Sequence, residues 1–458
     1  MNNFFLVALI IYLITVILIG VFDFKKIKSF TDFSVAGKNQ NAFAVVMTLL
    51  ATVVGASTTI GITDTVYKIG FPGIWWLAFG ALGLILQSVF LSEKVRRINA
   101  DTLPDLAGKI VGRPAEMLIS LIIVISWVGV IAGQLAAMKS IITLALGRDN
   151  KAVFLTVVVI VILYTAIGGQ MSVVRTDRLQ LIIIITGVAA ILFYLYFVKG
   201  GNTLDVINNI ELLNADYKTT DLFNQLFVIG GVYFLGPDIM SRNFISKDEA
   251  TAKKSAKVAG ILLFGFSLMI TFVGMWIRFN VTAEEMGENG ALLYALTFLP
   301  KPVALLLLFG LLSAILSSTD TCIINASSIF VKDILKKDSV VSVRVAVMVF
   351  GGMALALVLL GRSDIMSLLS GAYSIYTPGV IFPLMIAILA YGKRKINVRL
   401  WLLSVITGGI FGITGAYFPN VILISGAPDI VVKNFTIIGM ILSLIIAFMS
   451  VKISNKRY

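Results

Sequence analysis

Residues 48–65 read TLLATVVGASTTIGITDT, an apolar stretch that is interrupted by glycine and by small polar residues. A second apolar stretch, residues 227–240, reads FVIGGVYFLGPDIM and is interrupted at Gly236 and Pro237. Proline has no backbone N–H, and it disfavours helical backbone in the residue before it. Inside a membrane, backbone that leaves a helix is tolerated only where it is buried in protein or lines a cavity. We therefore predict two broken helices at the centre of a membrane protein.

The composition of the whole chain is that of an all-α integral membrane protein. Of the 458 residues, 58% are hydrophobic and 13% are charged, and the mean hydropathy is +0.98. Soluble domains carry about 25% charged residues. Apolar runs long enough to cross the hydrocarbon recur from one end to the other, and the alternation of a membrane β-barrel is absent. We expect a multi-pass protein of the cell membrane (plasma or bacterial inner) that contacts the lipid bilayer directly.

Composition also argues against several classes of function. The net charge of +13 is not gathered into a basic stripe, so no nucleic-acid partner is indicated. Histidine, the commonest metal ligand, is absent, and the single cysteine, Cys322, lies inside an apolar run. No pairing of a nucleophile with a base and no metal cluster is evident. We predict that the protein is not an enzyme and has no organic cofactor.

About thirteen membrane spans are predicted from the apolar runs and from the distribution of Lys and Arg. Lys and Arg favour the cytoplasmic side of a membrane. They are concentrated in alternate gaps between the spans, for example at Lys25, Lys26 and Lys28, and around Arg242. This alternation predicts an amino terminus outside and a carboxyl terminus in the cytoplasm. The predicted spans are 3–22, 41–66, 71–93, 113–146, 152–168, 176–199, 220–241, 255–279, 302–335, 341–361, 364–391, 398–419 and 430–452.

The spacing of the two interruptions predicts an internal repeat. They lie five spans apart, and because five is odd the two helices run in opposite directions through the membrane. Paired interruptions in inverted repeats are typical of the central site of a transporter. The alternative is that membrane helices simply contain more glycine and proline. We predict one transmembrane domain over 1–458, in which repeats 41–199 and 220–391 are preceded by helix 3–22 and followed by two helices in 398–452.

The run 305–330, LLLLFGLLSAILSSTDTCIINASSIF, concentrates hydroxyl groups in its second half. Ala314, Ser317 and Ser318 stand at i, i+3 and i+4, so they share one face of a helix. Neutral oxygens from hydroxyls and from carbonyls released by a broken helix suit sodium, a hard cation. The alternative is that these hydroxyls bond their own helix backbone or allow close packing.

Two carboxylates are predicted to lie inside the membrane, where an unpaired charge is costly. Asp320 follows the serine pair, and Asp177 opens the span 176–199. They are either cation ligands or structural groups, with Arg175 or Arg178 as salt-bridge partners and a helix amino terminus as a further role for Asp177. Two further polar residues have a functional and a structural alternative. Gln134 either contacts a solute or joins helices by hydrogen bonds, and Tyr233 either gates a cavity or packs in the interior.

Four motifs together resemble the solute:sodium symporter family over about residues 25–395. They are TLLATVVGASTTIG in the first interruption, YTAIGGQMSVVRTDRLQ (164–180), GPDIMSRNFISKDEATAKKSAK (236–257) and SAILSSTDTCIINASSIFVKDI (313–334). The resemblance implies the inverted-repeat fold of the leucine-transporter type, with additional helices before and after the core. It also implies Na⁺ as the co-transported ion. By position, the sodium ligands would be the carbonyls of Ala51, Val54 and Ala314 and the hydroxyls of Ser317 and Ser318.

A second cation site nearer the cytoplasm is implied for some family members. By position it would use Asp177, Ser317, Asp320 and Thr321. The family members carry serine where this chain has Asp320, and an additional carboxylate would either strengthen cation binding or bind a proton.

The resemblance implies uptake of a small polar solute by alternating access. Family solutes include sugars, amino acids, sialic acid, pantothenate and other carboxylates. The solute would contact Thr58, Thr59, Gln134 and Tyr233. The alternatives are a proton-coupled carrier that uses Asp177 and Asp320, a channel, and a solute sensor that does not transport. The sequence predicts no oligomeric state.

Overall fold

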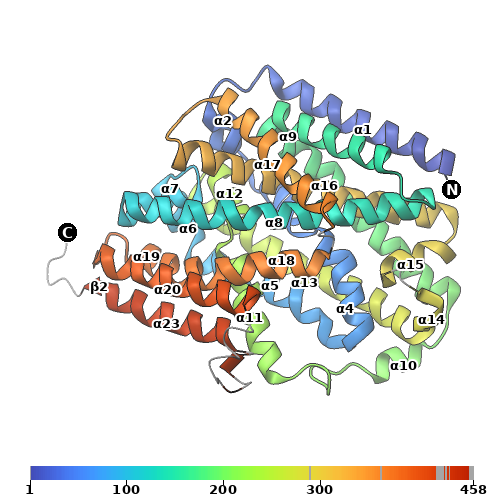
Figure 1. Ribbon diagram of the computed structural model, residues 1–458. Helices are drawn as coiled ribbons and strands as arrows, with labels where there is room; N and C mark the ends of the chain where they lie inside the picture. Colours follow the sequence, from blue (N-terminus) through green and yellow to red (C-terminus); the bar gives the residue numbers. More distant parts are fainter. Residues whose placement is uncertain are drawn as a thin grey trace.

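The computed structural model describes residues 2–287, 290–361, 364–418, 428, 431–432 and 434–452. Within these residues the chain is almost entirely helical, which confirms the predicted fold class. The helices run roughly along one direction, with the start of α1 at one end of the molecule and β2 at the other (Figure 1). The small sheet pairs β1 (Lys395–Ile396) with β2 (Val451–Lys452) in antiparallel register. Four of the Lys and Arg residues whose distribution predicts the orientation, Arg362, Lys433, Lys456 and Arg457, lie outside the described residues.

The longer helices follow the predicted spans. They are α1 (Asn2–Phe24), α3 (Ala42–Val53), α5 (Trp75–Phe90), α8 (Arg113–Leu146), α9 (Lys151–Phe193), α11 (Thr219–Leu235), α13 (Glu249–Asn280), α16 (Lys301–Ile329), α17 (Val340–Leu359), α18 (Ile365–Tyr376), α20 (Val398–Tyr417) and α23 (Phe435–Ser450).

Shorter helices continue the long ones or connect them. They are α2 (Phe30–Val35), η1 (Ala36–Lys38), η2 (Ser57–Gly61), α4 (Ile62–Ile69), η3 (Phe71–Ile74), α6 (Ser92–Ile98), α7 (Leu103–Val111), η4 (Tyr194–Lys199), α10 (Thr203–Asn208), α12 (Pro237–Ile245), α14 (Ala283–Met286), α15 (Ala291–Phe298), η5 (Phe330–Ile334), η6 (Thr377–Ile381) and α19 (Phe382–Ala390).

The described residues contain nine helices long and apolar enough to cross a membrane, or ten when the bent pair 42–53 and 57–69 is one span. Three features separate this number from thirteen. The segment 151–199 forms one long helical stretch where two spans are predicted, and the apolar helices described over Phe5–Ile19 and Phe435–Ser450 each have fewer than 18 residues. The last predicted span, 430–452, also includes residues outside the described part. The number of spans therefore stays a prediction.

Gly169 interrupts the long stretch at the predicted boundary between 152–168 and 176–199. Its backbone is non-helical, with φ 51° and ψ −160°. A Cβ atom there would lie 2.8 Å from the carbonyl oxygen and from a ring carbon of Phe33. Glycine is therefore required both by the left-handed backbone and by the close approach of α2. At about 1.5 Å per residue, 49 continuous helical residues would be over twice as long as the hydrocarbon is thick, so this interruption divides the stretch.

Both predicted interruptions are confirmed. Helix α3 ends at Val53, Val54 has non-helical backbone (φ −89°, ψ 83°), and the chain then continues at an angle of 64° through η2 and α4. In the second interruption, α11 ends at Leu235, Gly236 is extended, and Pro237 occupies the first position of α12. Proline is well suited to that position because its missing N–H has no helical partner there.

Helix α16 lies at the centre of the molecule, packed against α9, α8, α17 and α3. Every residue of α16 from Gly310 to Ile329 is buried, including its whole run of hydroxyl groups. Large apolar side chains are exposed instead on peripheral helices such as α1, α17, α20 and α23. Polar groups inside and apolar groups outside are the arrangement that a bilayer requires.

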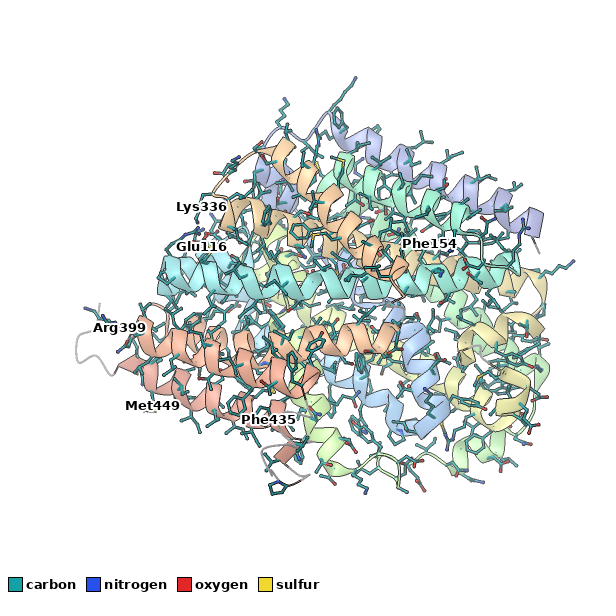
Figure 2. All side chains as sticks on the ribbon, in the orientation of Figure 1. Glu116, Phe154, Lys336, Arg399, Phe435 and Met449 are labelled. Atoms are coloured by element: carbon teal, nitrogen blue, oxygen red, sulfur yellow. The ribbon has the colours of Figure 1, made fainter. Side chains whose placement is uncertain are left out.

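Ion pairs join segments that are predicted to share the cytoplasmic side. Asp101 pairs with Lys38 and with Lys332, each at 2.7 Å. Glu116 at the start of α8 pairs with Lys336, and the two side chains lie together at one end of the molecule (Figure 2). These contacts connect segments that are far apart in the sequence. They favour the predicted threading of the chain.

Segments that are predicted to lie outside also contact one another, at the opposite end of α8. Lys139 pairs with Asp149 at 3.6 Å. Arg278 at the end of α13 donates to the carbonyl oxygens of Tyr67 (2.5 Å) and Lys68 (2.7 Å) at the end of α4. Which of the two ends faces the cytoplasm stays a prediction.

Candidate functional site

The break after α3 frees backbone groups that other parts of the protein then bind. In a continuous helix, the N–H of Gly55 would bond the carbonyl of Ala51. It donates instead to the hydroxyl of Thr58 at 2.7 Å. The N–H of Ala56 donates to Oε1 of Gln134 on α8 at 3.1 Å. The carbonyl of Ala51 has therefore lost its ordinary helical donor, which leaves an acceptor at the end of α3.

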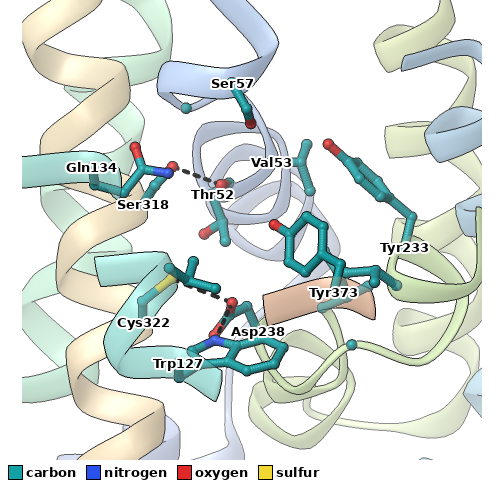
Figure 3. Close-up of a pocket in the computed structure, with 15 residues that line it drawn as sticks. Thr52, Val53, Ser57, Trp127, Gln134, Tyr233, Asp238, Ser318, Cys322 and Tyr373 are labelled. Atoms are coloured by element: carbon teal, nitrogen blue, oxygen red, sulfur yellow. Dashed lines mark hydrogen bonds between the residues drawn. The ribbon is translucent and has the colours of Figure 1, made fainter. Parts of the chain in front are cut away.

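Helix α16 meets this break directly. The hydroxyl of Ser318 donates to the carbonyl oxygen of Thr52 at 2.8 Å (Figure 3). The approach is so close that a Cβ atom on Gly55 would lie 2.5 Å from Oγ of Ser318. The end of α3 and the face of α16 that carries Ser318 therefore meet, as predicted. That Ala51, Val54, Ala314, Ser317 and Ser318 together bind sodium stays a prediction.

Ser317 connects this meeting point to Asp177 on α9. Its hydroxyl donates to Oδ1 of Asp177 at 2.5 Å, and the hydroxyl of Thr48 on α3 donates to Oδ2. Neither Arg175 nor Arg178 is the ion-pair partner of this carboxylate. That partner is Arg242 of α12, whose Nη2 lies 3.6 Å from Oδ2 of Asp177. The sequence predicts a salt bridge of Asp177 as one alternative, with Arg175 or Arg178 as its partner. The salt bridge is present, but its partner is Arg242.

Arg242 is the buried cation of this site that the charge pattern misplaced. Counted above with the cytoplasmic cations, it is 1% exposed inside the helix bundle. Its guanidinium donates to the hydroxyl of Thr321 at 2.7 Å and to the hydroxyl of Thr52. The signal available in the sequence was its position four residues after Asp238, on the helix that begins at Pro237. Residues four apart share one helix face, so Arg242 follows Asp238 into the interior.

Asp320 is held separately from Asp177. Its two carboxylate oxygens accept the hydroxyls of Tyr164 and of Thr165, the latter at 2.7 Å, both from α9. Of the residues predicted for a second cation site, Asp177 and Thr321 both contact Arg242, whereas Asp320 contacts only hydroxyl donors in the described part of the chain. A permanent cation therefore already stands beside two of these residues.

A small cavity lies where the two broken helices face α8, α16 and α18 (Figure 3). Its volume is about 40 Å³, room for no more than a few water molecules. Gln134 and Tyr233, two of the predicted solute contacts, line it. Thr58 and Thr59 do not. Their hydroxyls bond their own backbone, Thr59 to the carbonyl of Gly55 at 2.8 Å.

Asp238, which the sequence indicates only as a residue near a helix end, also lines this cavity. Its carboxylate accepts the indole N–H of Trp127 at 2.7 Å, the amide N–H of Asn325 at 2.6 Å and the thiol of Cys322 at 3.3 Å. The donors come from α8 and α16, so the position depends on the tertiary fold. Nothing in the local sequence beyond the break itself indicated it.

A larger cavity of about 750 Å³ lies at the end of α8 that is predicted to face outside. It is lined by polar groups that include Asp64, Lys139 and Asp149. Ile60 and Gly61 of η2 line it, while Ser57, at the start of η2, lines the small cavity. Helix η2 therefore lies between the two cavities.

Sequence comparison decides the family. The model of the sodium:solute symporter family matches residues 33–408. The chain belongs to this family. It is therefore a multi-pass membrane transporter rather than an enzyme.

The sodium/pantothenate symporter of Haemophilus influenzae is 26% identical over 358 residues, covering 73% of this chain and 72% of the relative. The sodium/proline symporter of Escherichia coli is 25% identical over 472 residues, and the match covers 95% of this chain and 93% of that relative.

Solved structures agree on the fold. A Na⁺-coupled sialic acid symporter in a substrate-bound outward-open state superposes with a TM-score of 0.80 at 19% identity, covering 99% of both chains. Mhp1, a nucleobase-cation-symport-1 family transporter, gives a TM-score of 0.59 at 13% identity and covers 91% of this chain and 93% of its own. These likenesses confirm the expected fold of the leucine-transporter type.

Proposed function

We propose that this symporter couples inward movement of Na⁺ to uptake of a small polar organic solute by alternating access. Its relatives are named for sodium-coupled transport of pantothenate and of proline. The ion would bind between the carbonyls of Ala51, Val54 and Ala314 and the hydroxyls of Ser317 and Ser318. The observation that carries the proposal is the bond from Ser318 to the carbonyl of Thr52, because it joins the two elements at the break.

The chemistry of these groups suits a monovalent cation. A hydroxyl that donates its hydrogen still has oxygen lone pairs free to coordinate an ion. Ser317 and Ser318 each donate to a neighbouring group, so their lone pairs remain available. The carbonyl of Ala51, which has lost its helical donor, adds another oxygen. An ion there would connect α3 to α16 and favour one arrangement of the two helices.

We propose a single sodium ion in each transport cycle. Of the implied second site, formed by Asp177, Asp320 and Thr321, both Asp177 and Thr321 lie beside the guanidinium of Arg242. A second Na⁺ would be repelled by that fixed charge at close range. The arginine would supply the positive charge that a second ion supplies in those family members for which the resemblance implies a second site.

Alternating access would move the repeats 41–199 and 220–391 relative to each other. Each repeat contributes one broken helix to the central cavity, as transporters with inverted repeats do. The polar cavity of about 750 Å³ lies on the side predicted to be outside, and the ion pairs of Asp101 and Glu116 lie at the opposite end. This distribution favours an outward-facing arrangement, with the exposed apolar side chains of the peripheral helices against lipid.

Solute uptake into proteoliposomes tests the coupling. An inward Na⁺ gradient at equal pH should drive accumulation of the solute above its outside concentration, and replacing Na⁺ with K⁺ should abolish it. Accumulation in sodium-free buffer with acid outside would instead favour the proton-coupled carrier. Equilibration without accumulation under an imposed Na⁺ gradient would favour a channel.

A further inference from the structure

Asp238 combines two features that rarely occur together in a membrane protein. It stands within the bundle at the first turn of α12, and it keeps part of its surface exposed to the central cavity. Its three partners, Trp127, Asn325 and Cys322, are all neutral donors. An ionisable group inside a membrane segment is costly to bury, so one that forms no ion pair is a candidate functional site.

The charge of Arg242 acts on Asp238 but does not pair with it. Within the described residues, its carboxylate makes no ion pair, and neither Lys nor Arg lines the cavity. Arg242, one helical turn away, is directed to Thr52, Thr321 and Asp177 instead. A carboxylate has about four acceptor positions, and three of those on Asp238 are used. The remaining acceptor position of Asp238 is available to a group that enters the cavity.

Aromatic rings enclose the same space. The Trp127 ring lies 5.1 Å from that of Tyr376, edge to face, and 6.5 Å from that of Tyr373. Tyr233 lines the cavity from α11, and Tyr233, Tyr373 and Trp127 surround it together with Asp238 (Figure 3). Aromatic faces beside a carboxylate are the recognised environment for an ammonium group, most of all a substituted one.

We propose that the solute of this symporter carries a positively charged nitrogen, which pairs with Asp238 and contacts the rings of Trp127 and Tyr373. The solute class is therefore amines, betaines and amino acids, rather than anionic carboxylates without an amine or neutral sugars. The inference rests on the proposed function, since it takes this cavity as the transport site. The charges agree with it: Asp177 pairs with Arg242, Asp238 and Asp320 form no ion pair among the described residues, and Na⁺ with one cationic nitrogen would supply two positive charges.

The size of the cavity limits the solute further. A volume of about 40 Å³ holds no organic solute, so side chains that line the cavity must move when the solute enters. The hydroxyl of Tyr373 makes no hydrogen bond within the described residues, and this ring is the one we expect to move. A compact solute such as choline, glycine betaine or proline fits this requirement better than an extended one.

A panel of solutes tests the inference on the wild-type protein in detergent. The melting temperature is measured with choline, glycine betaine or L-proline, and with 3,3-dimethyl-1-butanol, an uncharged analogue of choline. Pantothenate, N-acetylneuraminate and glucose complete the panel, and each solute is tested in NaCl and in KCl. The inference predicts stabilisation by at least one solute with a cationic nitrogen and none by the uncharged analogue. Stabilisation by an anionic or neutral solute only, or by no solute, would overturn it.

The two salts separate this inference from the proposed function. Stabilisation by anionic or neutral solutes that requires Na⁺ would leave the sodium coupling standing and remove the cationic solute. Stabilisation by cationic solutes that is equal in NaCl and KCl would leave the cationic solute standing and remove the sodium coupling. Choline, whose charge does not change with pH, also excludes solute titration as the cause.

An Asp238→Asn variant tests the residue itself. Leaving a buried charge unpaired is costly, so we expect the apparent affinity for the cationic solute to fall at least about tenfold. Asp205→Asn, on the exposed helix α10, is the control and should leave that affinity unchanged. Retained stabilisation of Asp238→Asn by Na⁺ shows that the variant folds, and unchanged solute affinity in such a protein would overturn the role of Asp238. Where the variant does not fold, the wild-type panel decides.

Discussion

The two broken helices interrupt the same kind of structure by different chemical means. The break after α3 contains no proline, and the groups it frees are bound by the hydroxyls of Thr58 and Ser318 and by the side-chain amide of Gln134. The break before α12 is made by Pro237, and the carbonyls just before it accept from a tyrosine hydroxyl and a glutamine amide. The hydroxyl of Tyr376 donates to Leu235 at 2.5 Å, and Nε2 of Gln87 donates to Phe234 at 3.2 Å.

This difference indicates a division of work. At the first break, backbone oxygens and hydroxyls meet, which is a set of ligands for a small ion. At the second break, the backbone is held by a tyrosine and a glutamine, and a carboxylate side chain is presented to the cavity. We infer that the first break binds the ion and the second break orients the solute. The predictions below separate the two roles.

The largest effect is expected from Ser317→Ala combined with Ser318→Ala. Removing two ligand oxygens from a bound cation should raise the Na⁺ concentration for half-maximal stabilisation or uptake by about a hundredfold or more. The measurement is a NaCl titration of the melting temperature at constant ionic strength, balanced with KCl. Ser328→Ala is the control, because Ser328 lies on the same helix but bonds Ser34 at 2.8 Å. An unchanged sodium requirement in the double variant would count decisively against the site.

Gly55→Ala should have the next largest effect on sodium. The new Cβ would lie 2.5 Å from Oγ of Ser318 and so push the break away from α16. Overpacking of this kind costs about 1–3 kcal/mol, which corresponds to roughly tenfold weaker sodium binding. Gly352→Ala on α17 is the control, since a Cβ there meets nothing within 4 Å. Both variants are measured by the same NaCl titration of the melting temperature. An equal sodium requirement in the two variants would show that the close approach of Gly55 to Ser318 does not matter for sodium binding.

Tyr376→Phe should affect the second break and spare the first. Leaving the Leu235 carbonyl without its donor costs about 1–3 kcal/mol, so the melting temperature should fall and solute affinity should weaken several-fold. The sodium requirement measured without solute should not change. Tyr196→Phe removes the same kind of bond, to the carbonyl of Phe272, away from both breaks. A shift of the sodium requirement in Tyr376→Phe alone would remove the proposed division of work.

The smallest effect is expected at the predicted cytoplasmic end. Burial raises the pKa of Asp101, whereas Lys332 and Lys38 lower it. The two lysines together outweigh burial, so the pKa of Asp101 lies below its ordinary value. Its ionised form therefore stabilises the fold at neutral pH, and this contribution is lost as the pH falls through the lowered pKa. Asp101→Asn should lower the melting temperature at neutral pH, and the difference from wild type should shrink as the solution becomes acidic.

Glu249→Gln is the control for Asp101, since Glu249 forms an exposed pair with Arg97 at the same end. Exposed ion pairs contribute little to stability. Its melting temperature should stay close to that of the wild type at every pH. A difference between Asp101→Asn and wild type that grows in acid would contradict the assignment.

Local patterns in the sequence were sufficient for the helices and for both breaks. Proline and glycine act on the backbone where they stand, so Gly236 and Pro237 predict an interruption without knowledge of the fold. The face shared by Ser317 and Ser318 follows from helical spacing alone. The pairing of that face with residues 51–54 came from the resemblance to a family.

Contacts between distant helices were beyond such patterns. Arg242 looks like one more cytoplasmic cation, and its burial beside Asp177 depends on how α12 approaches α9. Asp238 looks like a solvated helix end, and its three partners come from α8 and α16. Thr58 was expected to face the solute, but the break leaves backbone groups that its hydroxyl satisfies.

A density map of the protein in NaCl, compared with one in KCl, tests the central claim most directly. We predict a peak in the sodium map alone, between the carbonyls of Ala51, Val54 and Ala314 and the hydroxyls of Ser317 and Ser318. A sodium-dependent peak beside Asp177, Asp320 and Thr321, with none at the break of α3, would contradict the account.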